Sequence, residues 1–275
     1  MVLNPRPPTN CMTGVFFSLP QQYPPAGLFS QGHLLLLALT ALGISVSLRL
    51  SKGMTDLAVR RTVRVVTALL WVLEAAKIFF VLLVVGSRNP NEFLPLYYCS
   101  IILYAGLFSS LELPFWRHVG DAFIVMGGMV GGAVFLLMPT TSLPQYPTFH
   151  FISWHSFFLH GAMIYLGLLL LISGVYRPSV ADIRPVAMLS GAVCAVAFVF
   201  NTIYNRVAEE PVANLMFISR DFKGTPLSLI YRLCGPFFTP VMWLGQMFLP
   251  FFVTFLGISF AKCLADRHRK TAPKL

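Results

Sequence analysis

One cysteine and two histidines lie within apolar stretches of this sequence, and together these residue types could carry out acyl transfer. Cys99 lies in "EFLPLYYCSIILYAG" (residues 92–106), and His155 and His160 lie in "FHFISWHSFFLHGAM" (residues 149–163). In such chemistry a thiolate attacks an ester carbonyl, while a neighbouring histidine accepts the thiol proton and later protonates the leaving group. The two stretches must therefore meet in space, because they are too far apart in sequence for a local contact.

Each of these residues also has a structural interpretation. A lone buried cysteine is most often a small apolar side chain with an inert thiol. His155 and His160 are five residues apart, so on a helix they point about 140° away from each other. They cannot both face one partner equally well, and one of them is expected to be structural.

The composition is that of a polytopic membrane protein. The chain has 275 residues, of which 56% are hydrophobic and 11% are charged, whereas a soluble domain carries about 25% charged residues. The apolar residues form blocks long enough to cross a bilayer, which takes roughly 20 residues each. Because lipid offers the backbone no hydrogen-bond partners, these blocks must be helices. The five cysteines show no CxxC spacing, so neither a disulfide framework nor a zinc knuckle is indicated.

We expect an all-α membrane bundle of about seven transmembrane helices. The expected spans are residues 32–50, 63–86, 94–111, 120–138, 152–173, 186–205 and 237–261. They form a transmembrane domain over residues 28–262, between an irregular Pro-rich segment (1–27) and a basic C-terminal tail (263–275). The long connection 206–236 is too polar to span, and its apolar patch at 214–217 predicts a short helix or a cap.

The distribution of basic residues predicts the orientation. The net charge of +10 does not indicate a nucleic-acid partner, because the Lys and Arg residues lie in short loops and the tail. They are more numerous in the first, third and fifth loops and the tail than on the other side. The positive-inside rule therefore places the N-terminus outside and the C-terminus inside. We expect a multi-pass protein of the bacterial cytoplasmic (inner) membrane, with membrane lipids as its partners; the sequence does not indicate an oligomeric state.

Several further polar residues lie within the expected spans, in the same outer half of the membrane as Cys99. Intramembrane polar groups are costly and are therefore candidates for a site. Glu74 and Lys77, three residues apart, could orient a base or a lipid headgroup, or could form a packed ion pair. Asn201 and Asn205 could line a site or join two helices by hydrogen bonds. The glycines of residues 127–132 form two overlapping GxxxG patterns, which indicate close helix packing.

Four stretches together resemble one family. They are "WVLEAAKIFF", "LPLYYCSI", "VMGGMVGGAVFLLMP" and "FHFISWHSFFLHGAMIYLG". In this order they resemble the YwaF-like integral membrane proteins of bacteria, which are related to the eukaryotic transmembrane acyltransferase that remodels ether phospholipids. The resemblance covers about residues 60–245. It implies a cysteine acyl-enzyme that works without coenzyme A, with Cys99 as the nucleophile and His160 as the histidine of the F-x-x-H-G segment. Tyr97 stands where bacterial members commonly have a histidine.

The main hypothesis from the sequence is therefore a membrane-embedded acyltransferase, or acyl hydrolase, acting on phospholipid acyl chains. Cys99 is the expected nucleophile and His160 the expected base, with His155 as a second candidate. Glu74, Lys77, Tyr97, Asn201 and Asn205 are expected to line the substrate site, and no cofactor or metal is expected.

Two alternatives remain open. A zinc-dependent lipid hydrolase would use histidines and Glu74 as metal ligands, although zinc usually takes three protein ligands. A non-enzymatic transporter or membrane scaffold would use the same polar residues to bind a solute, with Glu74 and Lys77 as a coupling pair.

Overall fold

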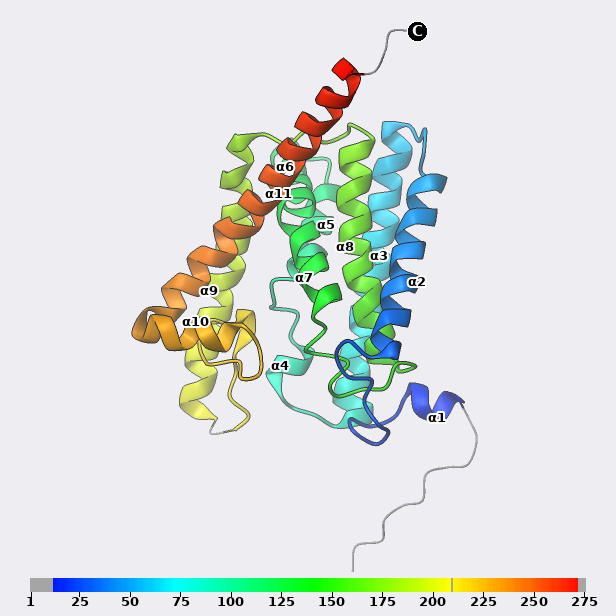
Figure 1. Ribbon diagram of the computed structural model, residues 1–275. Helices are drawn as coiled ribbons and strands as arrows, with labels where there is room; N and C mark the ends of the chain where they lie inside the picture. Colours follow the sequence, from blue (N-terminus) through cyan, green and yellow to red (C-terminus); the bar gives the residue numbers. More distant parts are fainter. Residues whose placement is uncertain (1–11, 209, 272–275) are drawn as a thin grey trace, which may run out of the picture.

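The computed structural model describes residues 12–208 and 210–271, and their regular structure is helical throughout. The helices run up and down a single bundle (Figure 1). The short helix α1 (Met12–Phe16) lies at one end, and the last helix, α11 (Phe238–Thr271), finishes at the other. We call the first of these ends the α1 end. The expected all-α, polytopic fold is confirmed.

Six helical stretches of the described residues are long and apolar enough to cross a membrane. They are α2 (Gln31–Leu50); α3 (Asp56–Phe79) with the π-helical turn η1 (Phe80–Val85); α6 (Pro114–Phe123) with the π-helical turn η2 (Ile124–Gly128) and α7 (Met129–Leu137); α8 (Phe151–Ile172); η3 (Val180–Asp182) with α9 (Ile183–Val207); and α10 (Leu227–Cys234) with η5 (Gly235–Phe237) and α11. The remaining elements are α4 (Pro90–Phe93), α5 (Ile101–Ser110) and η4 (Leu215–Phe217).

The expected continuous helix over residues 94–111 is wrong. Only α5 is helical there, and its ten residues extend about 15 Å, half the thickness of the hydrocarbon core. Leu94 is extended (φ −77°, ψ 123°), because Pro95 disfavours a helical conformation in the residue before it. The chain rises from α4 through a non-helical stretch, residues 94–100, to α5 (Figure 1). Cys99 lies in this stretch, two residues before α5 begins.

The other expected boundaries differ mainly in length. The second span begins earlier, at Asp56, because Thr55 caps the helix and its hydroxyl accepts a hydrogen bond from the N–H of Ala58 at 3.3 Å. The fourth begins at Pro114, since proline is well suited to the first turn of a helix. The seventh, α11, continues to Thr271 through most of the segment expected to be a tail.

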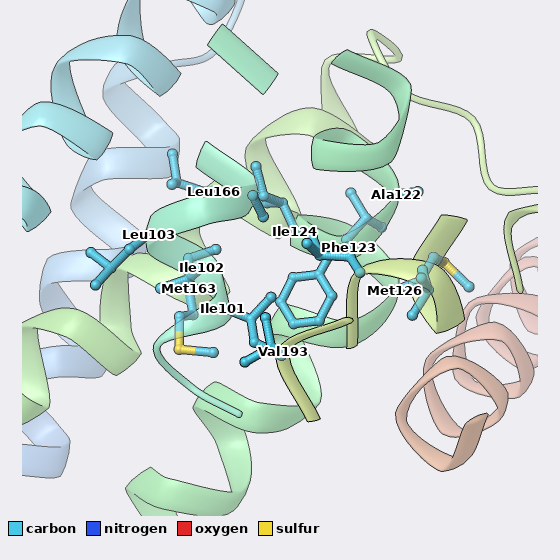
Figure 2. Close-up of a cluster of buried hydrophobic side chains, with 14 of the residues drawn as sticks. Ile101, Ile102, Leu103, Ala122, Phe123, Ile124, Met126, Met163, Leu166 and Val193 are labelled. Carbon is cyan, nitrogen blue, oxygen red and sulfur yellow. The ribbon is translucent and has the colours of Figure 1, made fainter. Parts of the chain in front are cut away.

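The core lies between α5 and the helices packed around it. Buried side chains from α5, the α6–η2 junction, α8 and α9 pack together (Figure 2). The figure labels Ile101, Ile102 and Leu103 of α5; Ala122, Phe123, Ile124 and Met126 of α6 and η2; Met163 and Leu166 of α8; and Val193 of α9. This core holds α5 in place although it is too short to span alone.

Close approach of α7 to α8 depends on glycine, as the GxxxG patterns predict. A Cβ on Gly132 would lie 2.8 Å from the carbonyl oxygen of His160, which is backbone and cannot move aside. A Cβ on Gly128 would meet nothing closer than 3.4 Å. The glycine at 132 therefore determines how near the His160 turn comes to α7.

The segment before α2 packs against the α1 end of the bundle. Phe17 lies against Phe80, with ring centroids 6.0 Å apart, and the N–H of Ala26 donates to the carbonyl of Tyr146 at 3.0 Å. His150, the N-cap of α8, accepts a hydrogen bond from the N–H of Ile152 at Nδ1 and contacts the carbonyl of Ser18 at 3.0 Å through Nε2. We call residues 15–28 the N-terminal cap.

Replacing Gly132 by alanine should destabilise the bundle, because the added methyl group meets backbone rather than a movable side chain. We expect a loss of about 1–3 kcal/mol in the free energy of unfolding. Gly128→Ala is the matched control and should change the free energy by well under 1 kcal/mol. Unfolding of both variants in bicelles by a denaturing detergent measures the difference, and equal values would contradict this account of the packing.

Acid should loosen the N-terminal cap. Burial lowers the pKa of His150 from its ordinary value of 6.5, partly offset by the bond to the Ser18 carbonyl. In acid, His150 binds a proton more readily when the cap is detached than when it is docked. The contribution of neutral, buried His150 to docking is therefore present above about pH 6.5 and is lost as the pH falls. Hydrogen exchange of residues 15–28 should rise between pH 7.5 and pH 5, after correction for the intrinsic exchange rate.

His150→Asn is the matched variant for this experiment. Asparagine is a good N-cap and does not titrate, so the pH dependence of exchange in the cap should be reduced. A pH dependence as large as that of the wild type would show that another group is responsible.

Candidate functional site

A charged triad joins α3 to α8. Glu74 is 2% exposed, and its two oxygens face different partners. Oε1 accepts a hydrogen bond from the ammonium of Lys77 at 2.5 Å, and Oε2 lies 3.2 Å from Nε2 of His155. The second contact has the distance of an ion pair, although the imidazole ring is not aligned for a hydrogen bond. The structure thus forms the ion pair expected at i and i+3 and adds His155 to it.

His160 is held differently. Its ring stacks on Phe135 of α7, with centroids 3.6 Å apart and planes 9° apart. Nδ1 lies 2.6 Å from the carbonyl oxygen of Ser156. A carbonyl can only accept, so Nδ1 carries the proton, and in a neutral ring Nε2 has the free lone pair. Nε2 is buried and has no hydrogen-bond partner among the described residues. This is the tautomer that a general base acting through Nε2 requires.

Cys99 is half-buried, and its thiol contacts α7 beside the same turn. Sγ donates a weak hydrogen bond to the carbonyl of Gly131 at 3.8 Å. Gly131 lies four residues before Phe135, so thiol and imidazole border one turn of α7. No direct hydrogen bond joins Cys99 to a histidine among the described residues. Catalytic hydrogen bonds are often long before substrate binds, and the Cys99–His160 contact stays a prediction.

Two peptide N–H groups beside the thiol are free. In the described part of the chain, the N–H groups of Tyr98 and Cys99 donate to no other residue. This is expected in the turn that leads into a helix, where the first N–H groups have no carbonyl before them to bind. Both groups lie just before α5 and could donate hydrogen bonds to an oxygen that carries negative charge.

Asn201 and Asn205 lie on the face of α9 that the sequence predicts, but they bind a loop. Asn201 is 1% exposed and forms two hydrogen bonds to the backbone of Leu215, at 3.1 and 3.0 Å. Asn205 makes the same pair of bonds to Ala213, at 2.9 and 2.7 Å. Tyr97 also faces this loop, since its ring lies 4.9 Å from that of Phe217. These three residues therefore border the loop rather than the thiol.

Two further side-chain amides bind this loop, and the sequence did not identify them as candidates. Asn91 of α4 and Gln246 of α11 also donate to the backbone of this loop, at Val212 and Met216. A signal was present in the sequence, because amide side chains within or beside apolar helices need partners. Their partner is irregular backbone, which carries no periodicity from which its position could be deduced.

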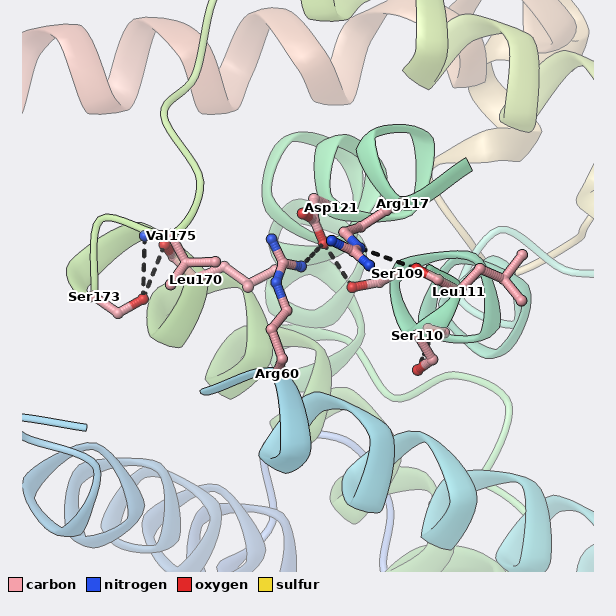
Figure 3. A network of polar contacts seen from close by, with 10 residues as sticks. Arg60, Ser109, Ser110, Leu111, Arg117, Asp121, Leu170, Ser173 and Val175 are labelled. Atoms are coloured by element: carbon pink, nitrogen blue, oxygen red, sulfur yellow. Dashed lines mark hydrogen bonds and ion pairs between the residues drawn. The ribbon is translucent and has the colours of Figure 1, made fainter. Parts of the chain in front are cut away.

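A second polar network lies at the end of the bundle opposite the α1 end. The buried carboxylate of Asp121 accepts hydrogen bonds from Arg60 at 2.7 Å and Ser109 at 2.6 Å (Figure 3). Asp182 likewise binds Tyr176 at 2.6 Å, and its other oxygen lies 3.0 Å from His118. Asp121 and Asp182 have partners on several elements, so this network ties α3, α5, α6 and the start of α9 together.

The described residues provide no metal centre. No group of three His, Cys, Asp or Glu side chains among them is close enough to hold an ion. A zinc site usually takes three protein ligands. In this part of the chain, the ligand set expected for a zinc-dependent hydrolase is therefore not assembled.

The comparison with known families covers the whole bundle. Residues 28–262 match the TMEM164 family. The chain belongs to this family of transmembrane proteins. The match begins just before α2, ends within α11, and so includes Cys99, the charged triad and both histidines of α8. No curated protein and no solved structure matches the chain.

Replacing Glu74 by alanine should destabilise the protein strongly, because it leaves the partly buried Lys77 ammonium without its carboxylate. Truncating one member of a buried ion pair costs about 3–5 kcal/mol in the free energy of unfolding. Glu112→Ala is the matched control: its pair with Arg64 is exposed, at 3.4 Å, and should contribute less than about 1 kcal/mol. Detergent-induced unfolding in bicelles measures both, and similar losses would show that the triad does not act as a buried charge cluster.

Proposed function

We propose that this TMEM164-family protein transfers or hydrolyses acyl groups of membrane phospholipids through a thioester on Cys99. One observation carries the proposal. A half-buried thiol and an imidazole with a free, buried lone pair border the same turn of α7. Both groups lie within a bundle of membrane-spanning length, where the available esters are those of lipids.

The reaction follows from the roles of these groups. The thiol transfers its proton to Nε2 of His160, and the thiolate attacks the carbonyl carbon of a phospholipid ester. A carbon–sulfur bond forms, the ester carbon–oxygen bond breaks, and His160 returns the proton to the departing lysolipid oxygen. The hydroxyl of a second lysolipid, or water, then attacks the thioester and restores the thiol. The first outcome is transfer and the second is hydrolysis.

The surroundings supply the remaining requirements. The free N–H groups of Tyr98 and Cys99 can donate to the oxygen that becomes negative during attack, in the manner of an oxyanion hole. Lys77, whose side chain is 18% exposed, is the cation that could meet a lipid phosphate. His155 lies against Glu74 and thereby orients it, so we assign the base role to His160.

An ester substrate has to enter deep into the bundle to reach His160. This histidine lies nine residues after Phe151, the first residue of α8, or about 13 Å along the helix. The same calculation places Glu74 about 16 Å from Val85, the last residue of η1. The first residue of α8 and the last residue of η1 both lie at the α1 end, the side predicted to be outside. We therefore expect the lipid to come from the outer leaflet.

The decisive experiment traps the thioester. Protein in nanodiscs is given phospholipids that carry an alkyne-labelled acyl chain, and the label on the protein is measured before and after neutral hydroxylamine, which cleaves thioesters. We expect hydroxylamine-sensitive label on the wild type and none on Cys99→Ser. His160→Gln should slow labelling by about 10²-fold or more, as loss of a general base does.

Matched variants keep this test specific. Cys234→Ser removes another half-buried thiol, and His118→Gln removes a half-exposed histidine at the opposite end; both should label like the wild type. Label that persists in Cys99→Ser, or wild-type protein that stays unlabelled across a broad set of phospholipids, would contradict the proposal. The second result would favour a non-enzymatic transporter or scaffold.

A further inference from the structure

The loop that Asn201 and Asn205 bind is unusual in being buried although its regular structure is limited to the short, distorted 3₁₀ turn η4. Ala213, Leu215, Met216 and Ile218 are each at most 1% exposed. We call residues 212–219 the inserted loop. Buried backbone groups must find hydrogen-bond partners, and irregular backbone at membrane depth is tolerated only where protein surrounds it.

Side-chain amides supply those partners. Asn201 and Asn205 each form a pair of hydrogen bonds to one loop residue, as described above. The amide of Asn91 donates to the carbonyl of Val212 at 2.8 Å and accepts from the N–H of Asn214 at 2.7 Å. Gln246 donates to the carbonyl of Met216 at 2.8 Å. We call Asn91, Asn201, Asn205 and Gln246 the amide clamp; its members come from α4, α9 and α11.

The clamp forces the loop into an otherwise unfavourable conformation. Met216 and Phe217 have φ of 58° and 52°, in the left-handed region that side chains larger than glycine rarely adopt. Such conformations persist only where the surrounding structure over-determines them, and they concentrate at functional sites. The fixed loop then presents the N–H of Met216 in one direction.

That N–H reaches the stretch that carries the proposed nucleophile. The N–H of Met216 donates to the carbonyl of Leu96 at 3.1 Å, three residues before Cys99. The same stretch is held at Tyr97, whose ring packs on Phe217 and whose hydroxyl donates to Asn91 at 3.2 Å. Within residues 94–100 the backbone makes only short local hydrogen bonds, from Leu96 to Leu94 and from Ser100 to Tyr97, so the contacts with the inserted loop help to fix the direction of this stretch.

We infer that Asn201 is a positioning residue for Cys99, acting through Leu215 and Met216 on the backbone of Leu96. Its side chain touches neither the thiol nor the space beside it. It holds Leu215 at both backbone groups, and the next residue along the loop holds Leu96. The catalytic meaning of this inference rests on the proposed function, whereas the coupling between the two segments does not.

The experiment therefore has two readouts on full-length protein in nanodiscs. Hydrogen exchange of residues 212–219 and 94–101 measures the coupling, with the amides of Met216 and Ser100 as reporters. The initial rate of thioester formation, measured over a series of labelled-lipid concentrations, measures the effect on chemistry. The variants are Asn201→Ala and, as the matched control on the same helix, Thr202→Ala, whose hydroxyl only binds the carbonyl of Phe198.

In Asn201→Ala we expect faster exchange at both Met216 and Ser100. The maximal rate of thioester formation should fall about 10- to 100-fold, as displacement by about 1 Å does, while the half-saturating lipid concentration stays unchanged. Thr202→Ala should behave as the wild type in both readouts. Gln246→Ala, which loosens Met216 from a different helix, provides the same test if Asn201→Ala does not fold.

The outcomes separate the two claims. Faster exchange confined to residues 212–219, with Ser100 unaffected, overturns the inference whether or not a thioester forms. Coupled exchange with an unchanged maximal rate also overturns it and leaves the proposed function standing. If the wild type forms no thioester, the proposed function fails, and coupled exchange would still establish that Asn201 positions residues 94–100.

Discussion

The structure depends on one constraint: a polar backbone group inside a membrane protein must find its partner within the protein. Helices meet this constraint locally, but residues 94–100 and the inserted loop do not. These two segments meet it together, through the hydrogen bond from Met216 to Leu96 and the amides around it. The clamp residues therefore satisfy the backbone of the inserted loop, and that loop in turn donates a hydrogen bond to the break in the third crossing.

Two polar clusters of the bundle satisfy their polar groups to different degrees, as a structural tie and the proposed site would. Asp121 and Asp182 are surrounded by an arginine, hydroxyls and a histidine on neighbouring elements, which suits a structural tie. The cluster of α3 and α8 also neutralises Glu74, but one turn of α8 further along, Nε2 of His160 has no partner. An unpaired buried nitrogen is costly, and a substrate proton would supply what the fold does not.

Much of the fold could be predicted from the sequence, because hydropathy and length determine which segments can cross a bilayer. The Glu74–Lys77 pair and the close packing of Gly132 followed from spacing along one helix. The break at Leu94–Ser100 did not, because hydropathy averages over a proline and reports only that the stretch is apolar. The targets of Asn201 and Asn205 could not be predicted either, since they are backbone atoms of an irregular loop, positioned by tertiary contacts alone. That His155 joins Glu74 likewise depends on how α3 lies against α8.

The break also bears on why a nucleophile would be placed at Cys99. Within a helix, the N–H of a cysteine is bound to a carbonyl four residues earlier and cannot contact a substrate. Just before α5, the N–H groups of Tyr98 and Cys99 donate to no other described residue, and the thiol lies beside them. For acyl transfer, a single interruption of the helix thus provides both the attacking group and donors for the oxygen that becomes charged. The irregular stretch would cost stability on its own, and the inserted loop offsets part of that cost through the hydrogen bond from Met216 to Leu96 and the packing of Phe217 on Tyr97.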